Sequence, residues 1–310
     1  GGGIAAPRDG AAPASPAPSP EDCSPDGWCT TYGPDGFTYL GIGASGPSDL
    51  WIVGYGGTIL HGDGTNWSTS VVGTSVVGSS LVGVWGTASD DVWAVGERGQ
   101  IQHYGGAGWA PGAAWVPGAN GTMQNLWAVW GSADSDVWAV GAGGTALHWN
   151  GSTWASTPTG SINVLLGVWG SGPDDVWVVG CKGTVLHWDG HAWSPFDSGS
   201  TDTLRAVWGS SASDVWIVGP ASSSLHWNGS KWSALPSGSN QSLVGVHGSG
   251  PDDVWGVGGF GTIVHWDGAA WSAAASGTTN ALYGVWTGDA QEAWAVGDSA
   301  SIVHRRTAGP

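Results

Sequence analysis

Histidine and acidic residues recur in this sequence at a spacing that could support metal binding or acid–base chemistry. In seven places a histidine lies ten residues after a tryptophan, and an acidic residue lies two residues before the same tryptophan. Imidazole and carboxylate groups bind zinc and also act as general acids and bases. The histidines are His61, His103, His148, His187, His226, His265 and His304, and the acids are Asp49, Asp91, Asp136, Asp175, Asp214, Asp253 and Glu292.

The regular repetition of these pairs favours a structural role over a catalytic one. Equivalent histidines on a third strand lie far from a ring axis, because strands are spaced about 4.7 Å apart, whereas ligands of one zinc ion approach to about 2 Å. A histidine and an acid of one unit can instead form a hydrogen-bonded pair that satisfies two partly buried polar groups. We therefore predict structural pairs, with no metal and no cofactor. Calcium stays open at the SGPDD turns, residues 171–175 and 249–253, although Asp at a turn more often caps backbone amides.

Binding is better sought where the units differ, because positions that all units share are required by the fold. One variable column opens the first predicted strand of each unit and contains Trp127, Arg205 and Tyr283 among aliphatic residues. If these side chains face a central funnel, they are the best candidate ligand contacts, and the alternative is that they pack between units. His247, which replaces a tryptophan, and Trp115, in an insertion between units two and three, are weaker candidates.

The elements that must position these residues follow from the period of the sequence. The repeat tryptophans are spaced by 42, 45 and then four times by 39 residues, which indicates one repeat architecture rather than two average domains. A typical unit, residues 165–193, contains three short β-rich runs and an Asp-Gly pair that predicts a hairpin into a fourth strand. Seven four-stranded sheets cover one another when arranged radially, so the sequence predicts an all-β, seven-bladed β-propeller.

The two ends of the chain are predicted to close this ring. The seventh unit stops before any fourth strand, and Trp28 precedes Leu40 by about the distance that separates a fourth-strand tryptophan from the next unit elsewhere. We therefore expect an N-terminal strand around Trp28 to complete the seventh blade and remove two open edges. Cys23 and Cys29 enclose a short loop with Pro and Gly, which favours a disulfide over two unpaired thiols.

Composition sets further limits on partners and location. The net charge of −17 repels nucleic acid and anionic lipid, and no apolar run is long enough to span a membrane, so direct membrane insertion is not expected. We expect residues 1–22, rich in Pro, Ala, Gly and Ser, to be a disordered tether, residues 23–306 to form the propeller, and residues 307–310 to be a tail. A disulfide indicates an extracellular, cell-surface or periplasmic location, with a preceding lipid anchor left open.

The segments GVWGSGPDDVWVVG and TVLHWDGHAW resemble the tryptophan-rich propeller repeats common in secreted and lipid-anchored proteins of myxobacteria. The resemblance covers roughly residues 23 to 306. HWDGHAW is also similar to the Asp-box hairpin of sialidases, without its leading serine, and WD-repeat propellers use a comparable network within each blade. In sialidases the Asp-box is a structural turn remote from the catalytic face, so this likeness implies the fold and not the chemistry.

Non-enzymatic binding is the function that these observations favour. No aperiodic nucleophile, acid–base pair or metal cluster is present, and five arginines, one of them in the tether, do not supply the arginine cluster of a sialidase. We favour carbohydrate recognition by exposed tryptophans with Asp or Asn acceptors, although core packing is the more frequent role of such tryptophans. The alternatives are a protein-interaction scaffold with one patch, and a structural surface role.

Overall fold

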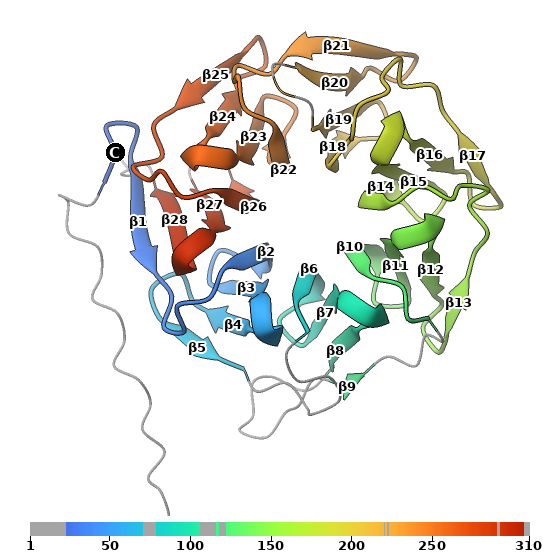
Figure 1. The fold of residues 1–310 in the computed structure, drawn as a ribbon, viewed down its shortest axis with the longest axis horizontal. Coiled ribbons are helices and arrows are strands. Elements are labelled where there is room, and N and C mark those ends of the chain that lie inside the picture. Colours follow the sequence, from blue (N-terminus) through green and yellow to red (C-terminus); the bar gives the residue numbers. More distant parts are fainter. Residues whose placement is uncertain are drawn as a thin grey trace, which may run out of the picture.

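The computed structural model describes residues 23–70, 79–105, 116–117, 122–219, 221, 223–289 and 292–306. All strands in these ranges belong to seven four-stranded antiparallel sheets, arranged as blades around a central opening (Figure 1). The predicted all-β, seven-bladed β-propeller is therefore confirmed. The expected tether, residues 1–22, and tail, residues 307–310, lie outside the described residues. No helix in the described ranges is both long and apolar enough to cross a membrane.

The blades follow one another along the chain. Blade 1 contains β2 (Tyr39–Gly46), β3 (Asp49–Gly54), β4 (Ile59–Gly62) and β5 (Trp67–Thr69). Blade 2 contains β6 (Leu81–Ala88), β7 (Asp91–Gly96), β8 (Ile101–Gly105) and β9 (Val116–Pro117). Blade 3 contains β10 (Leu126–Ala133), β11 (Asp136–Gly141), β12 (Ala146–Trp149) and β13 (Trp154–Ser156). Blade 4 contains β14 (Leu165–Gly172), β15 (Asp175–Gly180), β16 (Val185–Trp188) and β17 (Trp193–Pro195).

The remaining blades have the same strand order. Blade 5 contains β18 (Ala206–Ser211), β19 (Asp214–Val218), β20 (Ser223–Trp227) and β21 (Trp232–Pro236). Blade 6 contains β22 (Leu243–Gly250), β23 (Asp253–Gly258), β24 (Ile263–Trp266) and β25 (Trp271–Ala274). Blade 7 contains β26 (Leu282–Asp289), β27 (Glu292–Gly297), β28 (Ser301–Arg306) and, from the other end of the chain, β1 (Trp28–Tyr32). Short 3-10 turns join second to third strands at η2 (Tyr55–Gly57), η3 (Glu97–Gly99), η4 (Ala142–Gly144), η5 (Cys181–Gly183), η6 (Gly259–Gly261) and η7 (Asp298–Ala300).

Local sequence explains why each unit turns where it does. In blade 4 the Asp189 carboxylate accepts the backbone N–H groups of His191 and Ala192, both at 2.9 Å, and Gly190 has a φ of 87°. A non-glycine residue rarely adopts that left-handed conformation, so the Asp-Gly pair fixes the hairpin between the third and fourth strands.

Tryptophans hold neighbouring blades together. The repeat tryptophan on the second strand of one blade packs edge-to-face on the fourth-strand tryptophan of the next blade, with ring centroids 5.0–6.0 Å apart. Such pairs contribute beyond the area that they bury. The pairs are Trp93 with Trp154, Trp138 with Trp193, Trp177 with Trp232, Trp216 with Trp271, Trp255 with Trp28, and Trp294 with Trp67.

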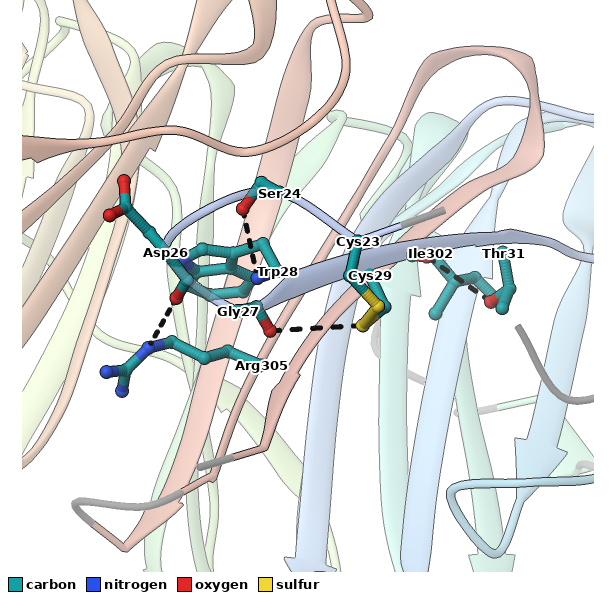
Figure 2. The surroundings of a disulfide bond; sticks show 9 residues. All are labelled: Cys23, Ser24, Asp26, Gly27, Trp28, Cys29, Thr31, Ile302 and Arg305. Carbon is teal, nitrogen blue, oxygen red and sulfur yellow. Dashed lines mark hydrogen bonds between the residues drawn. A yellow bond between two sulfur atoms is a disulfide. The ribbon is translucent and has the colours of Figure 1, made fainter. Parts of the chain in front are cut away.

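The ring is closed by strand pairing between the two ends of the chain, as the sequence predicted. β1 lies beside β28 (Figure 1) and runs antiparallel to it. In this pairing Trp28 is opposite Arg305. Figure 2 shows the predicted disulfide between Cys23 and Cys29 in the hairpin that leads into β1. Arg305 donates from Nε to the carbonyl of Asp26 at 3.3 Å, and its guanidinium lies 5.1 Å from the Trp255 ring centroid, which adds a cation–π contact across blades 6 and 7.

Candidate functional site

The ring has two chemically different faces, because the connections of an antiparallel blade alternate between its two ends. We call one the mouth face. It carries the loops that lead from one blade to the next and the 3-10 turns between second and third strands. We call the other the turn face. It carries the turns between first and second strands and the hairpins between third and fourth strands.

The variable column predicted from the sequence lies at the mouth of the central channel. Its residues, which all line the channel, are Leu40, Val82, Trp127, Leu166, Arg205, Val244 and Tyr283. In six blades the strand register shifts at this residue, which is left without a partner on the second strand. Such a β-bulge re-aims a side chain. In these six blades the bulge explains why a residue that could have packed between blades instead faces the channel; Arg205 lies just before the first strand of blade 5.

The channel mouth forms a cavity of about 590 Å³. Below the variable column it is lined by a second ring of aliphatic side chains, Ile42, Val84, Val129, Val168, Val207, Val246 and Val285. Tyr55, from the turn η2, joins the lining at the mouth and is 50% exposed. A cavity of this size, mostly apolar with a few convergent polar groups, has the usual properties of a ligand site.

Some polar side chains at the mouth are hydrogen-bonded within the protein, and others have no partner among the described residues. The Tyr283 hydroxyl donates to Asp298 at 3.2 Å, and burial together with the Asp298 charge raises the pKa of Tyr283, so the phenol is neutral. Thr38 donates to the other oxygen of Asp298. Arg205 is exposed, and its backbone N–H is bonded to the Val218 carbonyl at 2.8 Å. Its guanidinium has no hydrogen bond or ion pair to any residue in the described ranges.

The 3-10 turns around the mouth hold side chains in an unfavourable backbone conformation. Their second residue has a positive φ, and this position is glycine in η2 and η4 but Arg98, Lys182, Phe260 and Ser299 in four other turns, with φ of 56–59°. Left-handed backbone costs a non-glycine residue about 1 kcal/mol. Strain of this kind often occurs at functional sites, so these turns are further candidate positions on the mouth face.

Replacing Lys182 with glycine should therefore raise the free energy of unfolding by about 0.5–1 kcal/mol, because the turn would no longer force a side chain into left-handed backbone. Chemical denaturation of both proteins measures the difference. Lys231, on the turn face, is the control, and its replacement by glutamine should change stability by less than about 0.5 kcal/mol. Destabilisation by Lys182→Gly would contradict this account of the turn.

Large apolar side chains are exposed only on the mouth-face side, as far as the described residues extend. These residues lie in blade-to-blade loops, in 3-10 turns, or at the mouth-face ends of fourth strands. Ile162 is 88% exposed and Phe260 is 77% exposed. The full set is Tyr32, Phe37, Tyr55, Met123, Ile162, Phe196 and Phe260.

Acidic residues, in contrast to the exposed apolar side chains, are concentrated on the turn face. The turn face carries most of the acidic residues of the described ranges, at Asp26, Asp49, Asp63, Asp90, Asp91, Asp134, Asp136, Asp174, Asp175, Asp189, Asp214, Asp252, Asp253, Asp267, Asp289 and Glu292. On the mouth face, Asp35, Glu97, Asp197 and Asp298 accept local hydrogen bonds, and Asp202 is the remaining acid. The mouth face also carries Arg98, Lys182 and Arg205.

The histidine–acid pairs lie within single blades, at the turn-face ends of the second and third strands. In six blades histidine Nε2 is 2.5–2.8 Å from the aspartate, and His304 Nε2 is 3.4 Å from Glu292 Oε1. Each ring also packs on the tryptophan of its own blade, with centroids 3.6–4.3 Å apart. Burial raises the pKa of Asp175, but hydrogen bonds from His187 and Ser171 outweigh burial and lower it. Across the described ranges no three His, Cys, Asp or Glu residues are arranged to hold a metal ion.

The structure separates His247 from the other candidates. His247 does not line the channel mouth but faces Thr287 of blade 7, whose backbone N–H donates to Nδ1 at 3.2 Å. Burial lowers the pKa of His247 to about 4, opposed by the charge of Asp253. Trp115 lies outside the described residues. The mouth therefore brings together Trp127, Arg205 and Tyr283 of the sequence candidates.

Several mouth-face residues were not found by sequence reasoning. Lys182 and Phe260 occupy the turn position that is glycine in two other units, and a comparison of that column would have found them. Met123 and Ile162 occupy equivalent positions in blade-to-blade loops where other units have small or polar residues. The same reasoning that singled out the variable strand column applies to both of these columns.

These features define the chain as a seven-bladed β-propeller with a variable, partly apolar channel mouth. No protein family matches the chain, and no curated protein matches it. Among solved structures it is similar to YCF48 bound to a D1 peptide, with 17% identity and a TM-score of 0.74 over 91% of this chain and 97% of that chain.

Two further structures are similar in the same way. YCF48 from Cyanidioschyzon merolae is 14% identical, with a TM-score of 0.70 over 90% of this chain and 99% of that chain. The WD40 propeller domain of Doa1 is 12% identical, with a TM-score of 0.75 over 91% and 98%. At these identities the likeness shows the propeller fold.

Proposed function

We propose that this propeller is a non-enzymatic protein-binding module that engages its partner through the mouth face. The observation that carries the proposal is that the exposed large apolar side chains of the described chain all lie on this side of the ring, among cations without partners. Exposed apolar surface beside polar residues is typical of protein interaction sites.

The structure favours a protein partner over the carbohydrate partner predicted from the sequence. That prediction depended on exposed tryptophans that could stack on sugar rings. Every tryptophan with a described side chain is buried or half-buried, and most pack against another tryptophan or a histidine. Repeated, equivalent sugar sites on tryptophan columns would therefore have little exposed ring surface for stacking, whereas the mouth face carries exposed aromatic and aliphatic side chains that differ from blade to blade.

Two further observations concern the kind of partner and the cellular compartment. A similar propeller, YCF48, has been solved with a D1 peptide bound, so a ring of this shape can hold a peptide segment. The disulfide between Cys23 and Cys29 favours an oxidising compartment, and we propose an extracellular, cell-surface or periplasmic location. The cavity, the cations and the apolar rim of the mouth face supply the contacts that a protein partner needs.

The test compares photo-crosslinking from two positions of blade 6 in the native host. A benzoylphenylalanine at Phe260 samples the mouth face, and one at Ala269, in an exposed hairpin, samples the turn face. We expect a discrete protein adduct from position 260 that excess unlabelled propeller competes away, and none from position 269. Adducts only from position 269, or an adduct from position 260 that glycosidases remove, would contradict the proposal.

A further inference from the structure

We propose that the channel mouth recognises an acidic segment of the partner protein, with a carboxylate on Arg205 and an adjacent apolar side chain in the cavity. This inference rests on the proposed function and names the chemistry of its partner. It depends on three observations: an unpaired cation in the cavity wall, an apolar lining around it, and further cations on the same face.

Arg205 is the charged side chain of the cavity lining. Its guanidinium is exposed and has no partner within the described ranges, and it makes no ion pair with Asp202 of the same loop. A guanidinium presents a planar set of donors that fits a carboxylate through two parallel hydrogen bonds. The β-strand that follows Arg205 and the backbone bond to Val218 hold its Cα at the channel wall.

The walls beside Arg205 accept an apolar side chain. Arg205 belongs to blade 5, and the aromatic residues Trp127 and Tyr283 belong to blades 3 and 7, with aliphatic residues on the blades between them. The Tyr283 hydroxyl is already bonded to Asp298, so its ring is the surface that remains for contact. A carboxylate followed by an aromatic or aliphatic residue therefore matches the cavity better than a polyanion does.

Residues of the mouth face outside the cavity also fit a segment that combines acidic and apolar side chains. Arg98 and Lys182 stand on the same face, on strained turns of blades 2 and 4, and their side chains have no ion pair with any described residue. Met123 and Ile162 lie in the loops of blades 3 and 4 and are exposed. An extended segment that leaves the cavity across blades 2 to 4 would meet both cations and apolar side chains. Four of the five acids on this face already accept local hydrogen bonds, whereas the turn face carries most of the acidic residues and repels an acidic segment more strongly.

The experiment selects ligands from a displayed library of random 12-residue peptides on the immobilised full chain. Selected peptides are then measured by fluorescence polarisation on the unaltered protein and on Arg205→Gln, Arg205→Lys and Lys231→Gln. Lys231 is the matched control, because it is an exposed cation on the turn face of the same blade as Arg205.

We expect enrichment of Asp or Glu beside an aromatic or aliphatic residue. Arg205→Gln should weaken binding by about 10- to 100-fold, Arg205→Lys should weaken it less, and Lys231→Gln should leave it unchanged. Binding should also weaken as salt rises. Enrichment of neutral or basic peptides, equal binding to the Arg205→Gln protein, or no enrichment would each overturn this inference. A protein adduct from position 260 in the presence of any of these results would still uphold the proposed function.

Discussion

Replacing Trp28 with alanine should lower the free energy of unfolding by about 3–5 kcal/mol, the range for truncating a fully buried aromatic side chain. Trp28 is 0% exposed and packs edge-to-face on Trp255, with ring centroids 5.2 Å apart. It also lies on the strand that completes blade 7, so its loss weakens the contact that joins the two ends of the chain. Equilibrium denaturation monitored by circular dichroism measures the change.

Tyr32 provides the matched control for this substitution. It lies on the same strand but is 57% exposed, so Tyr32→Ala should change stability by less than about 0.5 kcal/mol. If Trp28→Ala also lost less than about 1 kcal/mol, the N-terminal strand would not be the element that closes the ring.

The junction between blades 6 and 7 should respond to pH through His247. At most other junctions a first-strand tryptophan faces a glycine of the next blade, and a Cβ on Gly131, Gly170, Gly209 or Gly248 would lie 2.5–2.7 Å from that indole. In blade 6 the tryptophan is replaced by His247, and the facing glycine is replaced by Thr287, which is 3% exposed. The two replacements therefore form a matched pair.

The pKa of His247, about 4 in the fold, is below its ordinary value of 6.5 because burial disfavours the imidazolium. The fold binds the neutral ring, so this stabilisation is complete above pH 6.5 and is lost as pH falls from 6.5 towards 4. The loss should be about 3 kcal/mol. The difference between the unaltered protein and the His247→Trp, Thr287→Gly double variant isolates this contribution, since all other titrating groups are shared.

The single variants provide the control for the pairing. His247→Trp alone should destabilise the ring by about 1–3 kcal/mol, because the indole would press on the Thr287 side chain, and adding Thr287→Gly should recover most of that loss. A double variant that keeps the full pH dependence of the unaltered protein would show that His247 is not the titrating group.

The fold could be predicted from the sequence because each unit repeats the same local signals. The Asp-x-Trp spacing set the number of blades, and the Asp-Gly and Asn-Gly pairs set the hairpins. The incomplete seventh unit and Trp28 together predicted the shared blade. These features depend on the conformational preferences of the turn residues and on the spacing of the repeated units, and both can be taken from a single sequence.

The candidate site could be predicted only in part. Sequence variation selected Trp127, Arg205 and Tyr283, but the orientation of Trp127 and Tyr283 depends on a β-bulge at the start of their strands, which has no local sequence signal. Arg205 lies just before the first strand of blade 5 and lines the channel without such a bulge. The concentration of acidic residues on one face and of exposed apolar side chains on the other could not be predicted from the sequence alone. It depends on which face each loop occupies, and the strand topology determines that. The exposure of each tryptophan could not be predicted from the sequence either, because it depends on how neighbouring blades cover the ring; the described tryptophans are buried or half-buried, and sugar recognition stays a prediction.

Amide hydrogen exchange of the full chain, alone and with the partner protein captured from position 260, tests most directly whether the mouth face is the binding surface. We expect protection in the loops at 33–38, 157–164 and 196–204 and in the turns η5 and η6, with unchanged exchange in the turn-face hairpins. Protection confined to the hairpins that follow the third strands, or spread equally over both faces, would contradict it.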